Sequence, residues 1–282
     1  MKNTLLKSLK VSLSLAFVFM MCLSFSTTTK AASVKNIPVK KTISTDITGD
    51  GKADQILIQT TMNKYDQVQK FKIKVNKKWA LIKTLANQDV NYITAKYAKM
   101  TNSKEFIQII GIGQNGYVTF NQIYKYNNAS KKLYLVSNLN DTANAITSTT
   151  KNSLVLTHST QPSETGWITW KMSYAFRNNK LVLSNSTTST VKSVIGNNKK
   201  DYYSKLFQKN IFVTAKKMSF YNGKKLAYSV PANTKVTLKK LTMSNGKIYL
   251  QFQYEKKTGW ISVNNKNYES PYFEAVNSRL AG

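Results

Sequence analysis

Apolar and polar residues alternate with a period of two along several stretches of this chain. Phe71, Ile73 and Val75 are separated by lysines, and the same pattern recurs from Trp170 to Phe176 and from Ile248 to Tyr254. A period of two places successive side chains on opposite faces of a half-buried β-strand. Turn-forming residue pairs separate such stretches: Asn115-Gly116, Asn178-Asn179, Asn222-Gly223 and Asn245-Gly246. The pattern predicts an all-β protein, with a propeller-like or sandwich-like antiparallel N-terminal domain and a small C-terminal β-barrel.

One segment differs from the strand pattern. Between Asn198 and Asn210, the apolar residues Tyr203, Leu206 and Phe207 have helical spacing. We interpret this segment as part of a connector with a short helix. The expected organisation is a signal peptide at 1–32, a β domain at 44–190, the connector at 191–210 and a barrel at 211–282.

The N-terminal segment has the features of an export signal. Lys2, Lys7 and Lys10 precede an almost wholly apolar run from Val11 to Phe25, and small residues follow around Ala31. This order is typical of a secretory signal peptide, and the apolar run is shorter than the roughly 20 residues of a membrane span. We expect a secreted protein, with Gram-positive-like export, possible association with the cell wall and no integral membrane segment after cleavage.

A short acidic loop follows the signal segment. Three of the twelve acidic residues, Asp46, Asp50 and Asp54, lie within nine positions. Thr48 adds a hydroxyl oxygen and Lys52 a backbone carbonyl, so oxygen atoms recur at nearly every second position. Oxygen ligands in a flexible loop suit a calcium ion. The alternative is an acidic turn that balances the lysines nearby.

The twelfth position of this loop is Leu57, where an EF-hand needs a glutamate. The segment from Asp46 to Ile58 instead resembles the calcium loop of FG-GAP/VCBS-type repeats. The resemblance implies Asp46, Asp50 and Asp54 as side-chain ligands, with Thr48 in place of the usual Asp or Asn. It implies a structural calcium ion, because no acid or base accompanies the loop for catalysis.

The C-terminal segment has a strand, a turn, a longer strand and then Thr258-Gly259-Trp260-Ile261. It resembles bacterial Src-homology-three-like domains, which implies a small barrel that binds peptidoglycan or cell-wall peptides. We expect the ligand-binding groove to involve four tyrosines: Tyr221, Tyr228, Tyr249 and Tyr254. The alternative is that each lies half-buried against the barrel wall. Trp260 is expected in the core, and the similar Thr165-Gly166-Trp167-Ile168 is expected to be a strand entry.

We identify no catalytic residue. His158 is the single histidine and is accompanied by no nucleophile motif. The acidic residues outside the loop show no spacing that pairs two carboxylates for glycoside hydrolysis. The prediction is a non-enzymatic protein, with a cell-wall hydrolase or hydrolase accessory as the alternative.

The charge of the chain predicts its partners. The formal charge is +30, and removal of residues 1–32 takes away four lysines and no acidic residue, which leaves +26. Such a protein attracts anionic cell-wall polymers, namely teichoic acid and peptidoglycan, or other polyanions. Only Arg177 and Arg279 are arginines, so sequence-specific nucleic-acid binding is not expected. A secreted factor that acts on host or rival cells is a further alternative.

Overall fold

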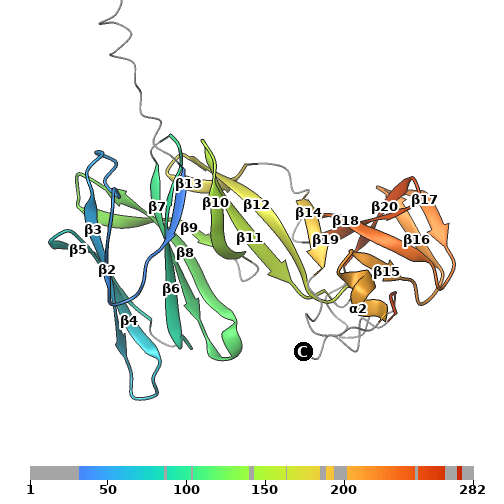
Figure 1. Ribbon diagram of the computed structural model, residues 1–282, viewed down its shortest axis with the longest axis horizontal. Coiled ribbons are helices and arrows are strands. Elements are labelled where there is room, and N and C mark those ends of the chain that lie inside the picture. The colour runs from blue at the N-terminus through green and yellow to red at the C-terminus, as the bar shows by residue number, and fades with distance from the viewer. Residues whose placement is uncertain are drawn as a thin grey trace, which may run out of the picture. The chain divides into compact units, whose positions relative to one another are not determined.

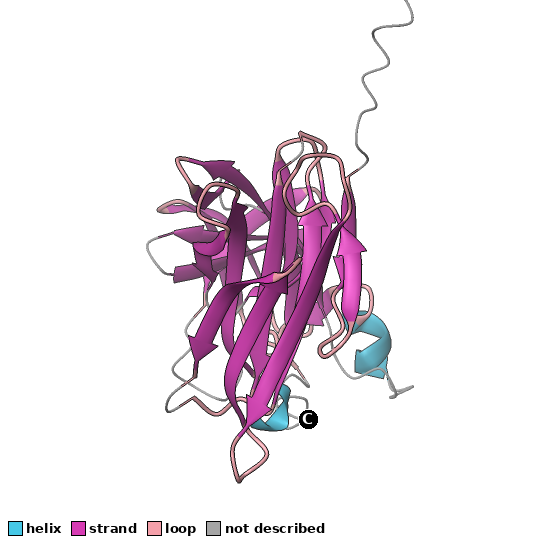
Figure 2. Ribbon diagram, turned by 90° about the vertical axis from the view of Figure 1, so that its left-hand side faces the viewer, coloured by secondary structure: helices cyan, strands magenta, loops and turns pink. Residues whose placement is uncertain are grey.

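The computed structural model describes residues 32–85, 88–102, 104–139, 143–162, 164–184, 189–193, 202–244, 247–263 and 272–274. Strands dominate this part of the chain (Figure 2), and its helices are the 3-10 turn η1 (Gln114–Gly116) and α2 (Tyr202–Phe207). The predicted all-β fold is therefore confirmed. The signal segment 1–31, residues 194–201 of the connector and the Asn245-Gly246 turn lie outside the described residues.

Three hydrogen-bonded sheets contain the strands (Figure 1). The first sheet has the order β2 (Thr42–Thr45), β3 (Asp54–Met62), β4 (Val68–Val75) and β5 (Lys78–Thr84). The second has the order β1 (Ser33–Asn36), β6 (Tyr92–Lys99), β7 (Glu105–Ile112), β8 (Val118–Asn127) and β9 (Lys132–Leu139).

The third sheet contains the remaining strands, in the order β10, β11, β12, β14, β18, β19, β20, β16 and β17, with β13 paired to β12 and β15 to β18. Their bounds are β10 (Ala143–Thr149), β11 (Ser153–Thr160), β12 (Ile168–Arg177), β13 (Lys180–Leu183), β14 (Ser189–Ser193), β15 (Ile211–Val213), β16 (Met218–Asn222), β17 (Lys225–Val230), β18 (Lys235–Ser244), β19 (Lys247–Tyr254) and β20 (Lys257–Ser262). β12 begins at Ile168, as expected for a strand entry.

The first and second sheets form a sandwich with one apolar core. Ile56, Phe71 and Ile73 of the first sheet belong to the same buried cluster as Ile109 and Phe120 of the second. The rings of Phe71 and Phe120 stack with their centroids 6.1 Å apart. Of the two predicted arrangements, the structure has the sandwich-like one, because the alternating apolar residues of two sheets meet face to face.

The opposite face of the second sheet is also covered. Phe106 and Ile123 pack in a second buried cluster with Leu154, Leu156 and Leu181, which belong to the third sheet. Burial on both faces explains the nearly continuous apolar sequence of β7, in which seven of eight residues are buried.

The predicted C-terminal barrel is wrong, because the described C-terminal strands form an open sheet. Closure would require a free edge on β18. The first half of that edge pairs with β15 through Val236 and Thr237, and the second half pairs with β14 through Lys240 and Leu241. β14 pairs with β12 on its other side. The strands therefore extend the sheet towards β12 instead of closing on β17.

The predicted turns that fall on described residues, and the short helix, lie where hairpins and α2 are found. Asn178 and Asn179 join β12 to β13 with φ values of 49° and 59°, and Gly223 lies between β16 and β17 with φ of 62°. Asparagine and glycine tolerate this left-handed conformation. None of the helices in the described part of the chain combines the length and apolar character needed to cross a membrane.

We predict that Gly111→Ala destabilises the sandwich. A Cβ atom at this position of β7 would lie 2.3 Å from Cε1 of Phe120 and would push that ring off Phe71. Urea unfolding should show a loss of about 1–3 kcal/mol. A second change, Phe120→Leu, should recover part of the loss in the double variant; a full loss in that variant would contradict the steric explanation.

Candidate functional site

The acidic loop joins β2 to β3 and curls tightly between them. Gly49 and Gly51 have φ values of 78° and 90°, a conformation that side chains with a Cβ atom rarely adopt. Asp46 and Asp54 lie at the two ends of the curl, whereas Asp50 is exposed at its tip. The two glycines therefore allow the loop to bend this tightly.

Hydrogen bonds from the loop itself reach the carboxylates at its two ends. Asp46 accepts from the backbone N–H groups of Gly49 at 2.7 Å and Gly51 at 3.1 Å. Asp54 Oδ2 accepts from the backbone and hydroxyl of Thr48 and from the backbone of Ile47, at 2.9–3.0 Å. Its Oδ1 accepts from Asn76 at 2.8 Å. These contacts hold the loop against the start of β3.

A lysine supplies a positive charge to the same loop. Lys99 Nζ, at the end of β6, lies 3.0 Å from Asp46 Oδ2 and 3.1 Å from Glu105 Oε1, and the described side chains of all three are largely buried. Burial by itself lowers the pKa of Lys99, but its hydrogen bonds to the two carboxylates outweigh that effect, and the net pKa is raised. Burial raises the pKa of Glu105 more than Lys99 lowers it. The ammonium group thus connects the loop to the second sheet.

These contacts bear on the predicted calcium site. The described residues include no group of three or more His, Cys, Asp or Glu side chains arranged to hold a metal ion. The predicted site needs one ion to contact Asp46, Asp50 and Asp54 together with Thr48 and the Lys52 carbonyl. To reach such an ion, the carboxylates of Asp46 and Asp54 would have to give up hydrogen bonds that they now accept. Calcium binding at this loop therefore stays a prediction.

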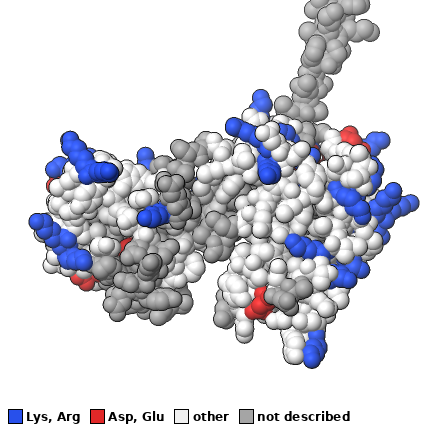
Figure 3. Space-filling model, turned by 180° about the vertical axis from the view of Figure 1, so that it is seen from behind, with Lys and Arg blue, Asp and Glu red and all other residues white. Residues whose placement is uncertain are grey.

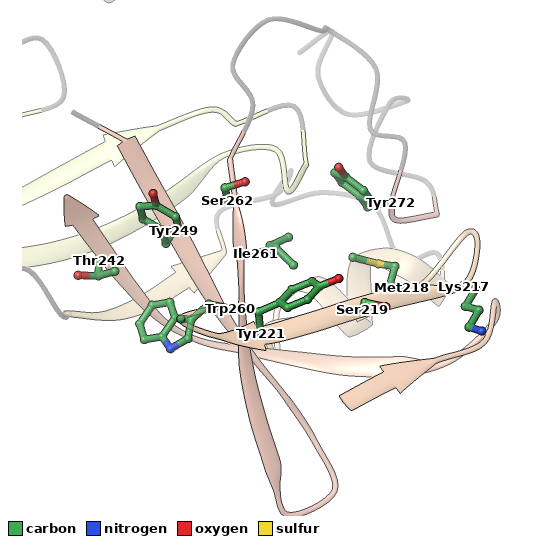
Figure 4. A pocket seen from close by; sticks show the side chains of 11 residues that line it. Lys217, Met218, Ser219, Tyr221, Thr242, Tyr249, Trp260, Ile261, Ser262 and Tyr272 are labelled. Carbon is green, nitrogen blue, oxygen red and sulfur yellow. The ribbon is translucent and has the colours of Figure 1, made fainter. Parts of the chain in front are cut away.

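A second candidate site is a pocket on the C-terminal strands (Figure 4). Its volume is about 660 Å³, and aromatic, hydroxyl and apolar side chains line it together with one lysine. The lining residues are Lys217, Met218, Ser219, Tyr221, Gly223, Thr242, Tyr249, Trp260, Ile261, Ser262 and Tyr272. Figure 4 shows Tyr221 on β16 reaching between Ile261 and Met218.

Strand register explains why these rings face outwards. Trp260 is paired with Tyr221 of β16 on one side and with Gln251 of β19 on the other. The preceding residue, Gly259, is buried, and a Cβ atom there would lie 2.7 Å from Cβ of Phe220. Because neighbours in a strand alternate between faces, an inward Gly259 turns Trp260 outwards. Trp260 was expected in the core, and that expectation is wrong.

The four predicted tyrosines separate into two pairs. Tyr221, with 43% of its surface exposed, and Tyr249 line the pocket. Tyr228 is buried, donates its hydroxyl hydrogen to the Phe252 carbonyl at 3.0 Å, and has its pKa raised by burial. Tyr254 packs against the core and stacks on Tyr228. The half-buried alternative therefore describes Tyr254, whereas Tyr228 is buried. Of the four tyrosines, Tyr221 and Tyr249 line the pocket.

Sequence reasoning missed several residues of this pocket. Ser219, Ser262 and Tyr272 join it from β16, β20 and the chain beyond β20. The alternation of β16 was a usable signal for Ser219, since Met218 and Phe220 on the core face require Ser219 on the other face. The contribution of Tyr272 had no such signal, because it depends on how a later segment returns to the sheet.

His158 is buried and unsuited to contact a substrate. Its ring lies between Trp170 and Tyr174, with centroids 5.5 Å and 5.9 Å away, and its Nε2 is 3.1 Å from the Tyr174 hydroxyl. Only 1% of its surface is exposed. Burial lowers its pKa to about 4, so the ring is neutral at physiological pH.

Comparison of the chain with protein-family models, with curated proteins and with solved structures gave no match. The candidate sites are therefore argued from their geometry and chemistry.

If the acidic loop binds calcium, the ion should raise the melting temperature of the protein relative to the same sample in chelator. Asp50→Ala should abolish the difference, and the change itself should cost little, because Asp50 is exposed and accepts only a local bond from the Lys52 backbone. Differential scanning calorimetry measures both effects. Identical melting temperatures of the wild type in calcium and in chelator would contradict the calcium site.

The buried His158 should make the fold sensitive to acid. In the unfolded chain His158 binds a proton below about pH 6.5, whereas in the folded chain its pKa is about 4. The free energy of unfolding should therefore fall between these pH values, by up to about 3 kcal/mol. Denaturant unfolding of His158→Gln should show a shallower decline with falling pH. Parallel pH profiles of wild type and variant would contradict this role.

Proposed function

We propose that this chain is an exported, non-catalytic protein that binds an anionic cell-wall polymer through the C-terminal pocket. The observation that carries the proposal is the outward pair of Tyr221 and Trp260, side by side on β16 and β20 in a pocket with hydroxyl groups and a lysine. The export signal expected at residues 1–32 supports a location where such polymers occur.

The chemistry of the pocket suits a wall glycan. Tyrosine and tryptophan rings offer flat apolar surfaces with a polar edge, which can stack on the C–H faces of a sugar ring. Ser219, Thr242 and Ser262 offer hydroxyl groups for the hydroxyls of a sugar, and Lys217 can attract a nearby anionic group. The resemblance of this segment to bacterial Src-homology-three-like modules points to the same class of ligand.

The charge of the protein supports attraction to the wall. With 42 basic and 12 acidic residues, the chain carries a field that raises the local concentration of polyanions. Figure 3 shows lysine and arginine side chains distributed over one face, with few acidic residues among them. Such attraction is long-ranged and weakens with salt concentration. The pocket would add short-range contacts that distinguish one polyanion from another.

We expect Trp260→Ala and Tyr221→Ala each to weaken binding to purified peptidoglycan that carries teichoic acid. Loss of an aromatic contact in a desolvated pocket should raise the dissociation constant about tenfold, equivalent to about 1.4 kcal/mol. Co-sedimentation with wall fragments at constant salt concentration measures the change.

Tyr65→Ala is the matched control, because Tyr65 is 69% exposed and belongs to the turn between β3 and β4. It should bind as the wild type does. Equal binding by the wild type and both pocket variants would contradict the proposal. Progressive clearing of a wall suspension by the wild type would instead favour the alternative of a cell-wall hydrolase.

A further inference from the structure

A second pocket lies between two hairpins of the sandwich, far along the sequence from the C-terminal pocket. It has a volume of about 560 Å³. The β4–β5 hairpin contributes Lys77 and Lys78, and the β8–β9 hairpin contributes Lys131. The remaining lining residues are Thr48, Ala53, Gln55, Val75, Asn76 and Tyr126.

The lysines of this pocket form no ion pair with the described residues. Lys77, Lys78 and Lys131 are all exposed. The carboxylate of Asp54 contacts the lining residue Asn76, but Asp54 is only 6% exposed and accepts four hydrogen bonds. Three like charges at one pocket, without a counter-charge facing them, favour binding of an anion.

The same two hairpins carry more lysines, beyond those that line the pocket. The ammonium groups of Lys72 and Lys74 lie 5.4 Å and 5.6 Å from the centre of the Trp79 ring. Lys132 Nζ donates to the Trp79 carbonyl at 3.3 Å and so links the hairpins. The positive charge is therefore held on paired strands, whose positions the hairpins fix.

The Tyr126 hydroxyl is a further hydrogen-bond donor at the pocket. Tyr126 lines the pocket, only 7% of its surface is exposed, and its hydroxyl has no hydrogen-bond partner in the described part of the protein. Burial, with a smaller contribution from the charge of Asp54, raises the pKa of Tyr126. The hydroxyl therefore keeps its proton and is available as a donor. It is not among the buried unpaired polar atoms of the described residues, so solvent reaches it, and an acceptor in the pocket could take its hydrogen bond.

We propose that this pocket binds the phosphate groups of a polyol-phosphate polymer. Separate ammonium groups act as point charges that suit a tetrahedral phosphate, whereas a planar carboxylate is best matched by the fork of an arginine, which the pocket lacks. The pocket also offers no open aromatic face for a nucleic-acid base, because its aromatic lining residue, Tyr126, is only 7% exposed.

This inference goes beyond the proposed function and depends on different residues. The C-terminal pocket would select a wall glycan, whereas the pocket between the hairpins would hold phosphate. Each can therefore fail without the other.

The test compares two variants that remove the same charge. Lys77→Gln/Lys78→Gln changes the pocket, and Lys151→Gln/Lys180→Gln changes two exposed lysines at turns of the third sheet. Isothermal titration of the full chain with lipid-free poly(glycerol phosphate) at constant ionic strength should show binding weakened about tenfold by the first pair and less than about threefold by the second. Equal losses in the two variants would overturn the proposal, because they would indicate a general effect of charge.

Tyr126→Phe removes only the hydroxyl group and should weaken binding about threefold, with the melting temperature monitored as a check of folding. Unchanged binding by this variant would count against the pocket. Inorganic phosphate should compete with the polymer more strongly than chloride at equal ionic strength, and equal competition would overturn a phosphate site.

Two further titrations distinguish the source of the phosphate. Single-stranded DNA and phosphatidylglycerol vesicles should bind more weakly than the polymer and should depend less on Lys77 and Lys78. Tighter binding of either one, lost in the pocket variant, would overturn the assignment to a polyol-phosphate polymer. Phosphate-free peptidoglycan should bind the pocket variant as it binds the wild type, which separates this test from that of the C-terminal pocket.

Discussion

Burial of the second sheet on both faces is the constraint on which the rest of the structure depends. Its inner strands β7 and β8 pack against the first sheet through Ile109 and Phe120 and against the third sheet through Phe106 and Ile123. Apolar contact on both faces fixes the register of these strands, because a shift by one residue would exchange the two packed faces. The hairpins that end in the lysine pocket and the strand that carries Lys99 belong to this arrangement.

The sequence predicted the individual strands better than the way in which they pair into sheets. Alternation of apolar and polar residues in Phe71 to Val75 and in Ile248 to Tyr254 was sufficient to predict half-buried strands, since the polarity of each side chain indicates whether it faces the core or solvent. The open C-terminal sheet was not predictable in this way. It results from the pairing of β14 with β18, which joins residues about fifty positions apart in sequence. Pairing of distant strands leaves no local pattern.

The candidate sites show the same limit. Tyr249 was predictable from its own strand, and the curl of the acidic loop followed from Gly49 and Gly51. Trp260 was misassigned, because its direction depends on the contact of Gly259 with Phe220 in another strand. The ammonium group of Lys99 beside Asp46, and the convergence of Lys78 and Lys131, also arise only when separate hairpins are brought together.

The ladder of β14 has a mechanical consequence. Residues 189–190 pair with β18 and residues 191–193 with β12, so few backbone bonds along this one strand connect the strands of the aromatic pocket to the sheet that covers the sandwich. A force that pulled the two pockets apart would load this short ladder. Side-chain packing of Ile168, Trp170 and Met172 of β12 in the same apolar cluster as the C-terminal strands would share that load.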